Sequence, residues 1–172
     1  MLSFLNKHSM TLLLVASLFL LGADNGEQGT DEQGNLLEQQ KQLNARIETL
    51  KLEQDYLLFQ KTMYASDSKY LVINAKARTG QLKYKNRILK DFHFTSAGKV
   101  GMLKQGALTL TKKTEEPKKG KLLIFGTSLA LQVKRVPAAQ LPAGLPRFLL
   151  SKKDFLSIFY AVEVGAKAYL LH

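Results

Sequence analysis

The chain has 172 residues, no cysteine and a net charge of +11 at neutral pH. This length suits one compact domain with additional segments. The absence of cysteine excludes disulfides, thiol catalysis, zinc–thiolate sites and a lipid-modified N-terminal cysteine. The charge is uneven, because residues 24–60 carry −5 and residues 61–172 carry +15. A surface this basic favours polyanionic partners, but lysines that merely keep a small domain in solution explain it equally well.

Residues 1–23 are typical of an export signal. An uncharged run of 14 residues, Met10–Ala23, is shorter than the roughly 20 residues of a spanning helix. Ala23 suits the position before a cleavage site, whereas Leu21 is larger than usual there. Cleavage after Ala23 is the preferred interpretation, and an inner-membrane anchor over 1–23 is the alternative. Both predict an exported, periplasmic protein, whose polyanionic partners are envelope polymers or lipid headgroups and not nucleic acid.

A polar linker is predicted over residues 24–35, and one long helix over residues 36–65. Its leucines recur every seven residues, at Leu36, Leu43, Leu50 and Leu57, with Tyr64 next. The other core positions are mostly polar, namely Gln40, Ile47, Gln54 and Lys61, which makes a weak coiled-coil seam. Self-association through residues 36–64 is slightly preferred. The alternative is packing onto the following domain through Leu37, Leu52, Leu58 and Phe59.

Residues 68–172 are predicted to form a mostly β domain of the α+β class, because the period of the pattern changes to two at Lys69. Strands are expected at residues 70–74, 81–84, 88–94, 106–113, 120–127, 129–136 and 166–171. One helix follows residue 150. Ser151 is its expected N-cap with Asp154 as capping partner, and Gly165 is expected to end it.

The order of these elements resembles the catalytic domain of bacterial L,D-transpeptidases, which cross-link the cell wall. The opening segment at residues 69–99 is similar to the family's first strands, and "RFLLSKKDFLSIFYAVEVGAKAYLL" at 147–171 is similar to its C-terminal part. Gly106 stands where the family has Thr-Pro-x-Gly, with Leu103 and Lys104 replacing the Thr-Pro. The resemblance covers about 60% of the chain and implies a β-sandwich with one C-terminal helix.

The family's catalytic residues are missing from the matching positions. Its Ile-His-Gly-Thr segment corresponds to Ile124–Thr127, with Phe125 in place of histidine. Its Ser-His-Gly-Cys-x-Arg segment corresponds to Pro142–Arg147, with Ala143 in place of histidine and Leu145 in place of the nucleophilic cysteine. The resemblance therefore implies a vestigial site at Phe125, Gly126, Thr127, Ala143, Gly144, Leu145 and Arg147. Phe125 and Leu145 are interpreted as core residues, and Arg147 as bracing the loop in preference to binding a carboxylate.

No catalytic residue, metal ligand or cofactor site is predicted elsewhere. Of the histidines, His8 lies in the export segment, His93 is expected to be exposed on a strand, and His172 is terminal. A lysine cluster is a candidate anion-binding patch, formed by Lys112, Lys113, Lys118, Lys119 and Lys121. The favoured function is a non-catalytic envelope protein that binds peptidoglycan, another anionic polymer or a protein partner. The alternatives are an assembly component acting through the long helix and, least favoured, an enzyme with a relocated site.

Overall fold

The computed structural model describes residues 29–98, 101, 103–116, 120–134 and 145–172. The predicted export segment, residues 1–23, lies outside the described residues. Within the described ranges, no helix is both long and apolar enough to cross a membrane. The chain divides into two compact units, residues 1–45 and 46–172.

Helix α1 spans Gly29–Ala65 and so begins inside the segment predicted as linker. Gly29 and Gly34 each weaken a helix by about 1 kcal/mol relative to alanine. However, no proline interrupts the segment, and extending an existing helix is much easier than starting one. The part of α1 in the first unit is solvent-exposed from Gly34 to Ala45.

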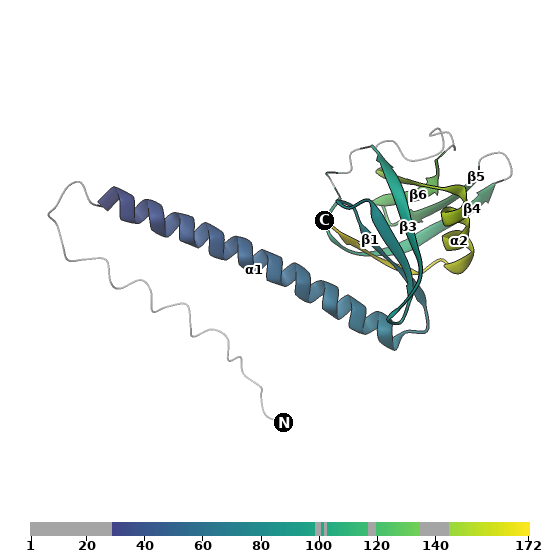
Figure 1. The fold of residues 1–172 in the computed structure, drawn as a ribbon, viewed down its shortest axis with the longest axis horizontal. Coiled ribbons are helices and arrows are strands. Elements are labelled where there is room, and N and C mark those ends of the chain that lie inside the picture. Colours follow the sequence, from purple (N-terminus) through teal and green to yellow (C-terminus); the bar gives the residue numbers. More distant parts are fainter. Residues whose placement is uncertain (1–28, 99–100, 102, 117–119, 135–144) are drawn as a thin grey trace, which may run out of the picture. The chain divides into compact units, whose positions relative to one another are not determined.

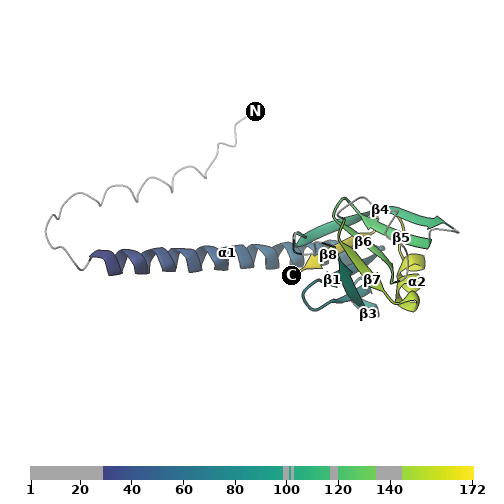
Figure 2. The same ribbon diagram turned by 90° about the horizontal axis from the view of Figure 1, so that it is seen from above.

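In the part of the chain that the structure describes, eight strands follow α1, with one short helix among them; Figures 1 and 2 show their arrangement. The strands are β1 (Lys69–Asn74), β2 (Thr79–Tyr84), β3 (Arg87–Ala97), β4 (Gly106–Glu116), β5 (Gly120–Phe125), β6 (Leu129–Val133), β7 (Arg147–Leu150) and β8 (Lys167–Leu171), and α2 covers Lys152–Ala161. The strands close into a barrel in the order β1-β2-β3-β7-β6-β5-β4-β8. The β6–β7 and β8–β1 pairs are parallel, and the other six are antiparallel.

The prediction of a mostly β domain is confirmed. The strands form a closed barrel, however, and not the expected sandwich. Strands β3 and β4 are longer than predicted, and each passes from one half of the barrel to the other. The first part of β4 pairs with β8 up to Thr109, and its remainder pairs with β5 from Leu110. A register shift between Leu110 and Lys112 marks this change of partner. Such a bulge bends a strand and increases its twist, which lets β4 join both halves.

The core is apolar, as the alternation of the strands predicts. The side chains of Leu71, Phe92, Phe125 and Phe148 are fully buried or nearly so. Phe92 lies directly over Gly80, where an added Cβ would come within 2.2 Å of the ring. Since overpacking a core distorts its neighbours, glycine at position 80 lets the ring fill the barrel.

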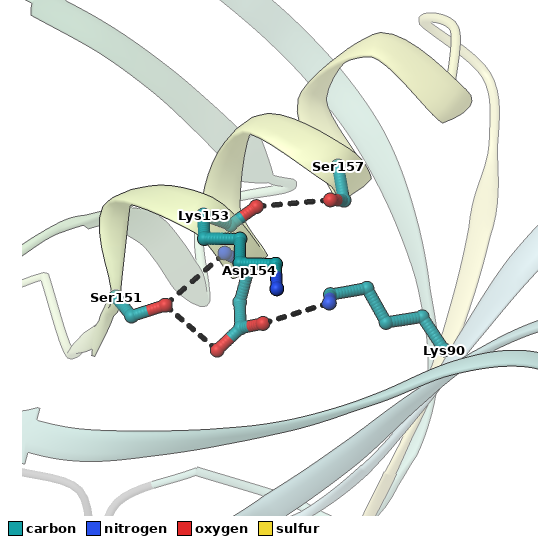
Figure 3. A network of polar contacts seen from close by, with 5 residues as sticks. All are labelled: Lys90, Ser151, Lys153, Asp154 and Ser157. Atoms are coloured by element: carbon teal, nitrogen blue, oxygen red, sulfur yellow. Dashed lines mark hydrogen bonds and ion pairs between the residues drawn. The ribbon is translucent and has the colours of Figure 1, made fainter.

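Helix α2 contributes Phe155, Ile158 and Phe159 to the same core. Its N-terminus is capped as predicted. The Ser151 hydroxyl accepts a hydrogen bond from the Asp154 backbone N–H at 3.1 Å and donates one to the Asp154 carboxylate at 2.7 Å. Figure 3 shows that Lys90 reaches the same carboxylate, with Nζ 2.9 Å from Oδ1.

The predicted end of α2 at Gly165 is wrong by four residues. The helix ends at Ala161 because Val162 adopts an extended conformation, with φ −114° and ψ 146°. Gly165 instead has φ 96° and forms the turn that leads into β8. A residue with this φ is strained unless it is glycine.

The C-terminal part of α1 packs on the barrel within the second unit. Tyr56, Phe59 and Met63 contact Tyr70, Val72 and Leu171. The Phe59 ring lies 5.7 Å from Tyr70 and 5.1 Å from Tyr169, measured between ring centroids. Of the residues proposed for this packing, only Phe59 takes this role, because Leu37, Leu52 and Leu58 remain exposed.

Candidate functional site

The turn between β5 and β6 holds the first group of the positions predicted to be vestigial. Phe125 is fully buried, whereas Thr127 is exposed. Gly126 has φ 56°, and its N–H donates a hydrogen bond to the Thr109 carbonyl at 3.0 Å. The N–H of Ser128 donates to the Phe125 carbonyl at 3.2 Å, which closes the turn. The turn thus presents the two hydroxyls of Thr127 and Ser128 beside a buried ring.

The second group lies at the start of β7, a strand that the sequence analysis missed. Leu145 is buried, with 9% of its surface exposed. The Ala130 N–H donates a hydrogen bond to the Pro146 carbonyl at 3.0 Å. Arg147 pairs in register with Ala130 on one side and Ala97 on the other. The remaining vestigial positions, Ala143 and Gly144, lie outside the described residues.

Parallel pairing of β6 and β7 therefore brings the two groups to the same end of the barrel. A surface pocket of about 400 Å³ lies there. It is lined by Leu103, Lys104, Gln105, Gly106, Ala107, Leu108, Thr127, Ser128 and Pro146. The lining combines one cation, one amide and two hydroxyls with apolar side chains. Such groups can hold a carboxylate, an amide or sugar hydroxyls by hydrogen bonds.

These lining residues do not form a nucleophile–base pair. Neither Thr127 nor Ser128 has a carboxylate or imidazole beside it among the residues that line the pocket. A hydroxyl needs such a base to attack a carbonyl at useful rates. The described lining thus offers groups that can bind a polar ligand, and it contains no carboxylate or imidazole beside the two hydroxyls.

The described histidines lie elsewhere or serve the structure. His93 is exposed on β3 between the buried Phe92 and Phe94, as the alternation predicts. His172 Nε2 donates a hydrogen bond to the Leu103 carbonyl at 2.5 Å, and its backbone N–H donates to Gln105 Oε1 at 3.3 Å. The end of β8 therefore braces the 103–105 wall of the pocket. In the described ranges, no group of three or more His, Asp or Glu side chains is placed to hold a metal ion.

Lys104 and Gln105 were not among the predicted site residues. The signal for this segment was the match of Gly106 to the family's Thr-Pro-x-Gly, in which Lys104 replaces the proline. That match concerned the start of a strand and did not show that the segment's side chains line a pocket. The pairing of β4 with β8, from Gly106 opposite Leu170, positions it.

Two members of the lysine cluster, Lys113 and Lys121, make hydrogen bonds and ion pairs in the described part of the chain. Lys113 Nζ donates to the Val162 carbonyl at 2.9 Å and lies 3.6 Å from Glu163 Oε1. Lys121 Nζ pairs with Glu115 and donates to the Tyr160 hydroxyl at 2.8 Å. These two lysines hold the end of α2, and their positions beside the Phe159 ring add cation–π contacts.

The bonding of Lys121 also changes the pKa of its ammonium group. Its hydrogen bonds to Glu115 and Tyr160 raise its pKa above the usual lysine value. Lys112 is exposed on β4, and Lys118 and Lys119 lie outside the described residues. An anion-binding role for the cluster stays a prediction that concerns Lys112, Lys118 and Lys119 foremost.

Comparison with known proteins finds no matching protein-family model and no matching curated protein. Among solved structures, the chain is similar to L,D-transpeptidase 1 of Mycobacterium tuberculosis (14% identity, TM-score 0.46), covering 62% of this chain and 63% of that one. It is similar to an L,D-transpeptidase of Stackebrandtia nassauensis (11%, 0.49; 63% and 57% covered). A third similar structure is the L,D-transpeptidase of Xylanimonas cellulosilytica (13%, 0.45; 62% and 61% covered). The chain thus spans less than two thirds of the length of each.

Proposed function

We propose that this chain is a non-catalytic envelope protein whose barrel is a vestigial L,D-transpeptidase-like domain that binds peptidoglycan or another anionic wall polymer. The observation that carries the proposal is the pair Leu145 and Phe125. Both stand where the resemblance expects a catalytic side chain, and both are buried hydrocarbon. A thiolate nucleophile is required by that chemistry, and the sequence has no cysteine at any position.

The pocket beside these residues supports binding without turnover. Lys104 supplies a positive charge at its edge, and Gln105, Thr127 and Ser128 supply hydrogen-bonding groups. Peptidoglycan stem peptides carry carboxylates and amides, and its glycan strands carry hydroxyls. The charge of +15 on residues 61–172 adds a long-range attraction for such a polymer.

Export is the second part of the proposal. Residues 1–23 direct the chain out of the cytoplasm, and either cleavage after Ala23 or retention as an anchor leaves the barrel in the periplasm. The mass of the N-terminal peptide of the protein purified from its own cells separates the two outcomes. Recovery of the protein in the cytoplasmic fraction contradicts both.

An assembly role through α1 is the second candidate function. The observation that favours it is the row of exposed leucines on this helix, among them Leu36, Leu43, Leu50 and Leu57. Exposed apolar rows of this kind are costly in water unless a partner covers them.

Co-sedimentation of the purified full chain with sacculi tests the wall-binding proposal. We expect retention at about 0.15 M salt, where exposed charges further apart than roughly 8 Å are screened. Lys104→Glu should lower the apparent affinity about tenfold, because a charge-assisted hydrogen bond contributes roughly 1.5 kcal/mol.

The matched control for this variant is Lys76→Glu. Lys76 is exposed in the turn between β1 and β2, so the substitution changes the net charge equally but leaves the pocket intact. It should lower retention much less than Lys104→Glu. An equal loss of retention in the two variants would show that the polymer binds outside the pocket. If the wild-type protein is not retained on sacculi, wall binding is excluded.

A further inference from the structure

Helix α1 carries two apolar rows, and the barrel uses only one of them. Tyr56, Phe59 and Met63 pack on the barrel within the second unit. Leu50, Leu57 and Tyr64 lie about 130° away round the helix axis, at 100° per residue. Their side chains are 54%, 63% and 61% exposed. Leu57 and Tyr64 border a surface pocket with Tyr70 and Lys83 of the barrel, but the packing of α1 still leaves more than half of each residue in this second row exposed.

The uncovered row continues along the helix as a heptad repeat. Leu43 and Leu36 extend it toward the N-terminus and are 61% and 64% exposed. With the leucines at position d, position a is filled by Gln40, Ile47, Gln54 and Lys61. A repeat of this kind over four heptads is typical of a two-stranded coiled coil.

We propose that α1 pairs with α1 of a second copy of this chain, in antiparallel orientation. In the antiparallel register, each position a residue lies in a layer with a position d residue of the second copy. Ile47 then lies opposite Leu50 of the second copy, and the symmetry of the pair forms this layer twice at its centre. Gln40 lies opposite Leu57, and Lys61 opposite Leu36.

Charge complementarity selects this orientation. In the antiparallel pair, Arg46 at the edge of the seam lies opposite Glu53 of the second copy, and this contact also forms twice. Neither Arg46 nor Glu53 takes part in an ion pair in the described part of the chain. Both charges are therefore available for contacts between copies.

A parallel pair would be opposed by like charges. It would place Arg46 opposite Lys51 of the second copy twice, and Lys61 opposite Lys61 inside the seam. It would also leave Leu37 and Leu58 without partners, whereas the antiparallel register sets them opposite each other across the helices. The antiparallel pair thus covers the leucines of the seam together with Leu37 and Leu58, and it avoids these repulsions.

Cysteine cross-linking tests the orientation, and the chain has no native cysteine to interfere. Gln40→Cys and Leu57→Cys are prepared separately in the full chain, one of them with a mass tag. Mixed under a thiol–disulfide buffer, they should form the mixed disulfide as the main product. Each alone should stay uncross-linked, since two copies of residue 40 lie about 25 Å apart in the antiparallel pair.

Self-linked Gln40→Cys in the unmixed sample would overturn the antiparallel orientation. An absence of both products, with a monomeric mass at tens of micromolar protein, would overturn the pairing itself. Cross-linking and sacculus retention are independent readouts, so this proposal and the proposed function can fail separately.

A charge at the centre of the seam provides the second test. Leu50→Glu should convert the full chain to monomer in sedimentation velocity, because it places two carboxylates in the central layers. Gln42→Glu adds the same charge on the outer face of the helix and should leave the dimer intact. Unchanged circular dichroism separates loss of pairing from loss of folding, and a dimer that survives Leu50→Glu overturns the proposal.

Discussion

Leu145 and Phe125 place hydrocarbon where the resemblance expects a thiol and an imidazole. Replacing a polar catalytic group by a buried apolar one fills volume in the core and removes an ionisable group from it. Arg147, in contrast, sits in the ladder between β3 and β6, and the bracing role expected for its side chain stays a prediction. At this scale our proposal is a site that keeps the frame of the resemblance without its chemistry.

Burial of position 145 can be measured with a single thiol. In Leu145→Cys the thiol should react with an aromatic disulfide reagent about tenfold more slowly than the thiol of Thr127→Cys, because thiol reactivity follows exposure. Thr127 belongs to the same end of the barrel but is exposed.

In denaturant both variants should react at the same rate, which is the control for intrinsic reactivity. Equal rates in the folded protein would show that position 145 is open to solvent. The burial of position 145, on which the proposed function relies, would then be refuted.

The residue patterns predicted local features well. Ser151 and Asp154 form the predicted capping pair, and His93 alternates with buried phenylalanines, because both features depend on neighbours in sequence. Lys113 and Lys121 were less predictable. Their partners Tyr160, in the last turn of α2, and Val162, directly after the helix, lie far away in sequence, and no local pattern predicts these contacts.

At the scale of elements, the contact between α2 and β3 depends on ionisation of Asp154. Partial burial raises the pKa of this carboxyl, but the hydrogen bonds from Lys90 and Ser151 outweigh burial and leave the pKa below its ordinary value. The folded state therefore binds this proton less readily than the unfolded state. Stability from Asp154 is complete above its unfolded pKa of about 3.9 and is lost as the pH falls through the lower folded value.

Asp154→Asn should accordingly destabilise the protein at pH 7 by about 1 kcal/mol, the usual size of one net hydrogen bond or capping contact. The difference from wild type should shrink as the pH falls below about 4. Urea unfolding, followed by circular dichroism at pH 7 and at a pH below about 4, measures this difference in the free energy of unfolding.

Glu48→Gln is the control, since its ion pair with Lys51 is exposed on both sides and should contribute little at either pH. A difference between Asp154→Asn and wild type that is the same at both pH values would contradict the assigned role of the charge.

Element boundaries show where sequence patterns stop being informative. Strand β7 has only four residues, Arg147–Leu150, and it is defined by pairing with β3 and β6, which are distant in sequence. The closure of the barrel likewise depends on the extra length of β3 and β4. Alternation predicted that these strands exist, but it contains no information on which partner each half of a long strand takes.

At the scale of the whole chain, an acidic segment precedes a strongly basic one. Residues 24–60 carry −5 and residues 61–172 carry +15. We assign wall binding to the basic barrel and pairing to the leucine row of α1. Neither role requires a catalytic group. This fits a chain that has no cysteine and whose described histidines are His93, exposed on β3, and His172, bonded to the Leu103 carbonyl.

Analysis of sacculi after incubation with the protein tests the central claim most directly. The purified full chain is incubated with sacculi, and the muropeptides are then released and separated by mass. The account predicts that the protein is retained on the sacculi while the muropeptide profile stays identical to that of a sample without protein. New cross-linked muropeptides or shortened stem peptides would contradict it.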